Sequence, residues 1–190
     1  MTFNINTFKT KVTSGVRPNL FKVQFNFPSG LGVNSNDEDF TYLCKSAALP
    51  SSTMGTIEVP FRGRNLKIPG DRTFDSWTVT FINDPNFKLR SAFENWINLV
   101  NKLDANVGNL SPDQIFQDLV VTQLSKTGTP ANAGDENLSV IRNYTLFGAW
   151  PSSVSQITLG YDQNDQIEEF DVEFQYQYFK IDGGSAGEIA

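Results

Sequence analysis

Acidic side chains near the end of the chain are the residues most able to do chemistry. Glu168, Glu169, Asp171 and Glu173 follow one another closely. Two carboxyl groups on one face can act together as general acid and base. Glu168 and Glu169 are adjacent, and adjacent residues of a strand point to opposite faces. Asp171 and Glu173 share a face, but at the polar rim of a strand we expect them to be solvated rather than catalytic.

The sequence lacks the residues that most enzymes use beside carboxylates. It has no histidine and one cysteine, Cys44. Ser-His and Cys-His nucleophiles, histidine bases and the commonest zinc, iron and copper ligand are therefore excluded. One cysteine also excludes an intramolecular disulfide and a thiolate metal site within one subunit, and Cys44 itself is expected to be a buried hydrophobe. We expect no enzyme, no cofactor and no metal.

The sequence contains no complete motif for binding calcium or a nucleotide. Asp162, Asn164, Gln166 and Glu173 match an EF-hand spacing, but Ile167 stands where the loop needs glycine. Neither GxxxxGK nor GxGxxG occurs, and the RGR at 62–64 is too short to indicate nucleotide binding. A formal charge of −6 also disfavours a nucleic-acid reader, because it repels phosphate.

Charge is distributed unevenly along the 190 residues. The last thirty carry eight acids and one base, whereas a short basic cluster lies earlier in the chain. This cluster comprises Arg62, Arg64, Lys67 and Arg72, with Asp71 between them. Patches of opposite sign on one chain permit head-to-tail self-association, although two independent solvated faces are the commoner outcome.

A long amphipathic strand is predicted to carry the carboxylates. In IEEFDVEFQYQYF, residues 167–179, aromatic and β-branched residues alternate with Glu169, Asp171 and Glu173. Period-two alternation places the apolar side on a core and the carboxylates opposite. The strand would reach about 40 Å, which suits a barrel or a wall.

Other segments indicate a mainly β protein. Alternation predicts strands over 20–27, 40–47, 76–82, 115–124 and 140–147, with a strand pair or extended loop over 51–68. Trp150-Pro151 is expected to end a strand, and 156–159 to begin a hairpin. A helical pattern occupies 87–103 after Asp84-Pro85. The sum is about eight strands and one flanking helix, a β-barrel or sandwich.

One domain is expected, with mobile ends. Residues 1–16 are predicted to form a flexible arm, 17–180 the β domain and 181–190 a flexible tail. Two exposed loops are expected at 28–39 and 125–137. No run of residues approaches the length of an apolar membrane span, so a soluble cytosolic product is expected.

Five blocks of sequence, taken in order, resemble a known family. They are RPNLFKVQF from Arg17, CKSAALP from Cys44, PGDRTFDSWTVTFINDPNF from Pro69, the helix with Trp96, and LFGAWPSSVSQITLGYDQNDQIEEFDVEF from Leu146. Together they resemble the tail tube protein of contractile-tailed bacteriophages of the T-even-like type, over roughly 17–179.

The resemblance implies a structural virion protein. Such subunits form stacked hexameric rings inside a contractile sheath, and the hollow tube conducts DNA without binding it specifically. The implied partners are further copies of the chain, the sheath, the baseplate or tube initiator, and the tape measure protein. Assembly in the host cytoplasm and location in the virion tail follow.

Two surfaces are expected to serve assembly. Some of Glu169, Asp171 and Glu173 are predicted to face the lumen or an adjacent subunit, because an acidic wall repels DNA. The segment from Arg62 to Arg72 is predicted to form a loop that contacts another subunit or ring.

Two other functions stay open from the sequence. A tube initiator or baseplate paralogue shares the same fold. A carbohydrate-binding β-sandwich adhesin would need exposed aromatic clusters, whereas most aromatics here fall on the apolar sides of strands.

Overall fold

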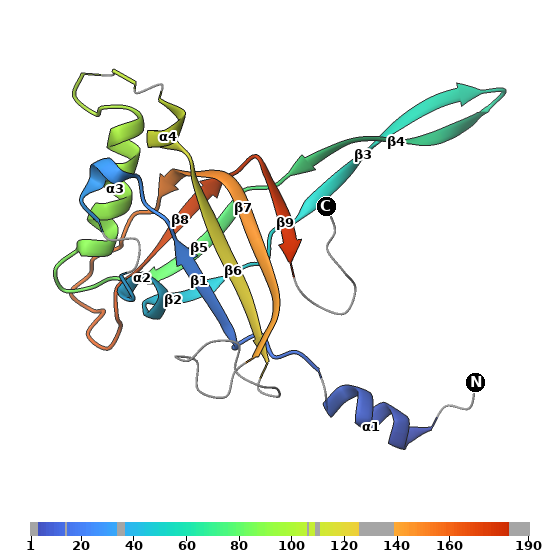
Figure 1. Ribbon diagram of the computed structural model, residues 1–190, viewed down its shortest axis with the longest axis horizontal. Helices are drawn as coiled ribbons and strands as arrows, with labels where there is room; N and C mark the ends of the chain where they lie inside the picture. The colour runs from blue at the N-terminus through green and yellow to red at the C-terminus, as the bar shows by residue number, and fades with distance from the viewer. Residues whose placement is uncertain are drawn as a thin grey trace.

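The computed structural model describes residues 4–13, 15–33, 37–105, 107–108, 111–125 and 139–182. Its elements, in chain order, are α1 (Ile5–Thr13), β1 (Phe21–Phe25), η1 (Ser29–Leu31), α2 (Asp39–Tyr42), β2 (Cys44–Ala47), β3 (Ser52–Phe61), β4 (Arg64–Phe74), β5 (Trp77–Ile82), α3 (Lys88–Val100), α4 (Pro112–Ile115), β6 (Gln117–Ser125), β7 (Ser139–Val154), β8 (Glu169–Gln175) and β9 (Tyr178–Asp182). Strands dominate and α3 flanks them, which confirms the predicted fold class (Figure 1).

Seven strands form one antiparallel sheet that folds over on itself. Its order is β1-β6-β7-β8-β5-β2, and β9 pairs with β7. The Phe25 ring of β1 lies 5.3 Å from the Phe81 ring of β5 and 6.0 Å from the Phe174 ring of β8. Side chains from the two ends of the sheet therefore meet across one core, and the fold is a sandwich whose layers share β7.

Strand β7 passes from one layer to the other at Gly148. This residue has φ 61°, and a Cβ there would lie 3.0 Å from Cγ of Gln177. Only glycine accommodates both conditions without strain. The prediction that Trp150-Pro151 ends the strand is wrong: Pro151 pairs with Phe174 of β8. Residues 150–154 of β7 pair with β8 along one edge, and no described strand pairs with their other edge. Proline is tolerated at such an edge, because its missing N–H takes no hydrogen bond from the sheet.

Aromatic side chains fill the core between the layers and α3. The largest fully buried ones are Trp77, Trp96, Phe81, Phe93, Phe170 and Phe174. Helix α3 closes one end by inserting Leu89, Phe93 and Trp96, and the Trp96 indole N–H donates to the Ile115 carbonyl at 2.9 Å. The alternation in the sequence thus predicted the core of the sandwich.

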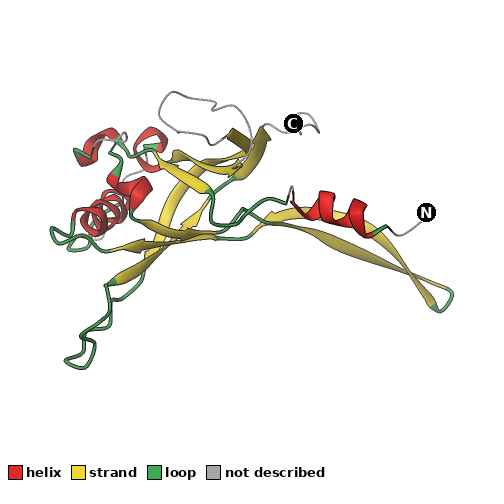
Figure 2. Ribbon diagram, turned by 90° about the horizontal axis from the view of Figure 1, so that it is seen from below, coloured by secondary structure: helices red, strands yellow, loops and turns green. Residues whose placement is uncertain are grey.

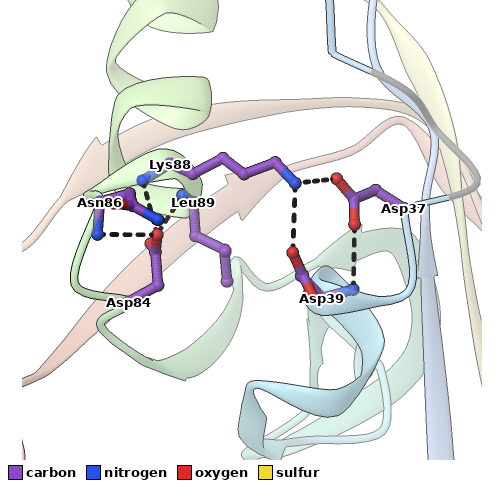
Figure 3. Close-up of polar contacts among 6 residues, drawn as sticks. All are labelled: Asp37, Asp39, Asp84, Asn86, Lys88 and Leu89. Atoms are coloured by element: carbon purple, nitrogen blue, oxygen red, sulfur yellow. Dashed lines mark hydrogen bonds and ion pairs between the residues drawn. The ribbon is translucent and has the colours of Figure 1, made fainter.

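The start of α3 depends on Asp84. Its Oδ1 accepts the Leu89 N–H at 3.1 Å, and its Oδ2 accepts the N–H groups of Asn86 and Lys88 at 3.2 and 3.1 Å (Figure 3). Lys88 and Leu89 are the first two residues of α3, and a helix leaves the N–H groups of its first turn without intrahelical partners. Asp84-Pro85 thus lies directly before the start of α3, as the sequence indicates.

Removing this cap should weaken the fold measurably. Asp84→Ala is expected to lower the free energy of unfolding by about 1 kcal/mol, since it deprives the first turn of its acceptor. Asp84→Asn keeps a side-chain oxygen and serves as the control, with a smaller loss. Urea unfolding of both variants would measure this, and equal stability of Asp84→Ala and the unchanged chain would contradict it.

An ion pair ties α3 to the segment before α2. Lys88 contacts Asp37, and its Nζ lies 3.1 Å from Oδ2 of Asp39 (Figure 3). The Lys88 ammonium holds the pKa of Asp37 below its ordinary value of 3.8. The ion pair of Asp37 with Lys88 therefore stabilises the fold at pH values above the ordinary pKa of Asp37. This stabilisation is lost as the pH falls through the lowered pKa that Asp37 has in the folded protein.

Three further local predictions are wrong. Residues 39–42 form α2 rather than the start of a strand over 40–47, and only β2 is extended there. No strand begins at 156–159, because 155–168 connect β7 to β8 without regular structure. The acidic strand is not continuous: β8 ends at Gln175, and the chain turns so that β9 pairs with the other half of β7.

The ends and long loops are described only in part. Within the predicted arm 1–16, the structure has helix α1. Strand β9 reaches Asp182, and 183–190 of the predicted tail lie outside the described residues. The loop 28–39 contains η1, with 34–36 outside the described range, and 126–137 of the connector also lie outside it. The mobility of these segments stays a prediction.

Candidate functional site and assembly surfaces

Strands β3 and β4 form a hairpin that projects from the sandwich. Of the strands in the described part of the chain, they pair only with each other, and they extend well beyond the rest (Figures 1 and 2). A two-residue turn closes the hairpin with Arg62 at φ 47° and Gly63 at φ 81°. Positive φ at both positions is the geometry that matches the twist of paired strands.

One face of this hairpin is apolar and uncovered. Cross-strand pairs bring Ile57 opposite Ile68 and Val59 opposite Leu66, with Phe61 at the tip. These side chains are between 42% and 67% exposed. An isolated two-stranded ribbon is marginal in water, and a contiguous apolar patch of this kind is typical of an interaction surface. The hairpin is therefore the first candidate assembly surface.

The basic cluster predicted from the sequence lies on this hairpin. Arg62 occupies the turn, and Arg64, Lys67, Asp71 and Arg72 lie on or beside β4, in a strand rather than a loop. The Lys67 Nζ lies 3.6 Å from Oε1 of Glu58, with both side chains largely exposed. Such exposed pairs contribute little to stability, so these charges are free to serve a partner.

The three predicted carboxylates share the face of β8 that points away from the core. Phe170, Val172 and Phe174 point into the core, whereas Glu169 and Asp171 are exposed and Glu173 is half-buried. The structure thus confirms the alternation, but it does not assign this face to a lumen or an interface.

Polar neighbours hold these carboxylates in place. Both Glu169 oxygens accept from Lys45 Nζ at 2.6 Å. Asp171 Oδ1 accepts from the Thr80 hydroxyl at 2.7 Å, and Glu173 Oε2 from the Ser153 hydroxyl at 3.3 Å. The face is therefore a largely polar wall of β2, β5, β8 and β7, in which Ile82 lies opposite Glu169 and Trp150 opposite Gln175. Lys45 offsets one negative charge within this polar wall.

The two lateral edges of this polar wall are unpaired. Strand β2 pairs only with β5, and residues 150–154 of β7 pair only with β8, among the residues that the structure describes. Unpaired strand edges carry N–H and C=O groups that another chain can bind. A second copy could therefore extend the wall at either edge.

Catalytic and ligand features are weak in the described residues. Cys44 is buried, and burial raises its pKa to about 12, so its thiol is not a ready nucleophile. No group of three or more cysteine and acidic side chains within that part of the chain could hold a metal ion. The described helices include none with the length and apolar character of a membrane span.

Comparison with known families identifies the relatives of the chain. The family described as "Phage tail tube protein" matches residues 16–182. The chain belongs to the phage tail tube protein family. Its structural role as a tail tube protein follows from that membership, and the predicted resemblance is confirmed.

Individual tail tube proteins are similar over most of their length. "Tail tube protein gp19" of Enterobacteria phage T4 is 30% identical over 164 residues, 86% of this chain and 90% of that protein. The "Tail tube protein" of Serratia phage KSP90 is 30% identical over 175 residues, 90% and 93% of the two chains. A chain in the sheath-tube complex of an extracellular contractile injection system shares the fold, with a TM-score of 0.61, 17% identity and coverage of 93% and 97%.

Sequence reasoning found the carboxylate face and the basic cluster of this tail tube family member, but it missed two features. The apolar face of the hairpin was signalled by Ile57, Val59 and Phe61 alternating with polar residues and proline. The unpaired edges of the wall had no signal, because pairing between distant strands is not visible in one sequence.

Proposed function

We propose that the chain is the repeating subunit of a tail tube, in which copies form six-membered rings that stack into a hollow conduit for phage DNA. The observation that carries this proposal is the projecting hairpin with its uncovered apolar face. A monomer gains nothing from holding such a surface in water, whereas a second copy would bury it.

Ring formation is supported by the polar wall. Its two unpaired edges lie on different strands, β2 and β7, so an edge-to-edge contact is heterologous: one surface of a copy meets a different surface of the next. Heterologous contacts close into a ring when the rotation between copies allows it. Six copies would then join their four-stranded walls into one continuous cylinder.

The wall provides a suitable lining for a DNA conduit. We place the face with Glu169, Asp171 and Glu173 toward the lumen, because it is hydrophilic and free of large apolar groups along β8. Repetition around each ring and along the tube sums these charges into a negative field that keeps a polyanion from adhering. Passage of DNA without specific binding follows.

The remaining partners belong to the same proposal. The sheath would surround the tube, the baseplate or initiator would nucleate it, and the tape measure protein would occupy it during assembly in the host cytoplasm. The role is structural, with neither catalysis nor a cofactor.

Electron microscopy of the purified chain tests this function. We expect hollow rings or tubes of uniform diameter, together with concentration-dependent species in size-exclusion chromatography. Rings that never stack would favour the tube initiator instead. A monomer at every concentration, also after addition of a tube initiator, would contradict the proposal.

A further inference from the structure

The tip of the hairpin combines an exposed aromatic ring with positive charge. Phe61 is 67% exposed, and the Arg62 guanidinium carbon lies 5.3 Å from the centre of its ring. Arg64 follows directly after the turn, and Lys67 lies further along β4. A partner for this tip must therefore offer an apolar recess with acidic groups around it.

A hollow with three apolar side chains in a mainly polar and acidic lining lies in the loop between β7 and β8, residues 155–168. The loop encloses a half-open hollow of about 730 Å³, which includes Ile157, Leu159 and Ile167 among its lining residues. Leu159 and Ile167 are 77% and 70% exposed, whereas Ile157 packs against the core and anchors the loop. The hollow is apolar in part and has no cover within the described subunit.

The rim of the same loop is acidic. Asp165 and Glu168 line the hollow, and Asp162 lies in the turn beside it. Glu168 accepts from the Asn83 side chain at 2.9 Å, which holds its carboxylate at this end of β8. No basic residue occurs between 155 and 168. The charges of this loop are therefore opposite in sign to those of the hairpin tip.

The two surfaces cannot meet within one subunit. In both views the hairpin tip and the β7–β8 loop lie at opposite ends of the long axis (Figures 1 and 2). Contact between them is necessarily heterologous: the hairpin tip of one copy meets the β7–β8 loop of the next. Each copy then still has one tip or loop available, so the same contact can repeat along a series of copies.

We propose that the Phe61 tip of one copy inserts into the hollow of the β7–β8 loop of a second copy, where Arg62 and Arg64 face Asp162 and Asp165. This inference rests on the proposed function, since it names the partner surface of the hairpin during assembly. Phe61 supplies the buried anchor and the charges set the orientation of the two copies.

Charge reversal tests this pairing directly. Arg62→Glu with Arg64→Glu, and separately Asp162→Arg with Asp165→Arg, should each raise the concentration needed for assembly about tenfold or more, because like charges then meet. Combining all four substitutions restores opposite charges and should recover most of the loss. Failure of the combined variant to assemble better than either pair would overturn the inference.

Cysteine cross-linking provides an independent readout. Arg64→Cys with Leu159→Cys leaves the Phe61 anchor in place and should give a covalent ladder under oxidation of the assembled protein, and buried Cys44 does not compete. The matched control joins Arg64→Cys to Leu103→Cys, a site that is 95% exposed in another loop. A second pair, Arg64→Cys with Ile5→Cys, tests the exposed side of α1 as the occupant instead.

The outcomes separate this inference from the proposed function. A ladder at least tenfold stronger for the Leu159 pair than for the Leu103 pair supports the inference. Assembled particles with a ladder only in the Ile5 pair, or in none, overturn the inference and leave the tube function standing. Absence of particles from the unchanged chain, with and without an initiator, overturns both.

Discussion

Removal of residues 56–69, with Gly55 joined to Gly70, is expected to give a folded monomer that no longer assembles. Among the residues that the structure describes, the deleted segment pairs only with itself and contributes no side chain to the core cluster, so its loss should leave the sandwich core intact. Met54 remains opposite Arg72, and Gly55, Gly70 and Asp71 form a short turn between them.

The loss of assembly should be large. Burial of one large apolar side chain contributes about 1.5–3 kcal/mol, and the deletion removes five that the hairpin exposes. Even two of them buried in each contact would favour association by about 3–6 kcal/mol, which is more than a hundredfold in the equilibrium constant. Light scattering and electron microscopy across a concentration series would measure the change.

Two controls make the deletion interpretable. A circular dichroism spectrum typical of β-sheet and a cooperative melting transition of the monomeric variant would show that the sandwich is intact. Ile57→Ser with Leu66→Ser should reproduce most of the defect, whereas Asn65→Ser, on the opposite face of the hairpin, should not. Tubes formed by the deletion variant at the normal concentration would contradict the assembly role of the hairpin.

Phe174→Ala is expected to cost about 3–5 kcal/mol of unfolding free energy. Phe174 is fully buried on β8, with its ring 5.5 Å from Trp77, 5.8 Å from Phe93 and 6.0 Å from Phe25. Alanine would leave a cavity where both layers and α3 meet. Since small domains are stable by about 5–15 kcal/mol in total, such a loss would bring the variant near unfolding.

Chemical denaturation of the assembly-deficient deletion protein would measure this effect without interference from association. Leu103→Ala is the matched control, because Leu103 is 95% exposed and its truncation should change stability by less than about 0.5 kcal/mol. A loss below about 1 kcal/mol for Phe174→Ala would mean that the core does not pack as the structure shows.

The elements that could be predicted from the sequence are those in which buried and exposed residues alternate at a regular spacing along the chain. Strands β1, β5 and β8 and helix α3 each bury one side of a regular repeat, so their residue types record both the element and its inner face. The carboxylate face of β8 was predictable for the same reason: it is the reverse of Phe170, Val172 and Phe174.

Features that depend on distant partners were not predictable. The alternation continues past Tyr176, yet the chain turns there because β7 bends at Gly148 and offers a different edge to β9. Pro151 was predicted to break a strand, because one sequence does not show that β7 pairs with β8 alone at residues 150–154 of the described chain. The hollow of the β7–β8 loop depends on how two irregular segments pack, although Leu159, Tyr161 and Ile167 among acidic residues were a signal.

The most direct test of the account is a cryo-electron microscopy reconstruction of the assembled protein. It would show together the symmetry of the ring, the environment of the hairpin and the direction in which β8 faces. We predict six-fold rings with the polar wall continuous across subunits and with Glu169, Asp171 and Glu173 toward the lumen. A tube with all three carboxylates on its outer surface would contradict the account.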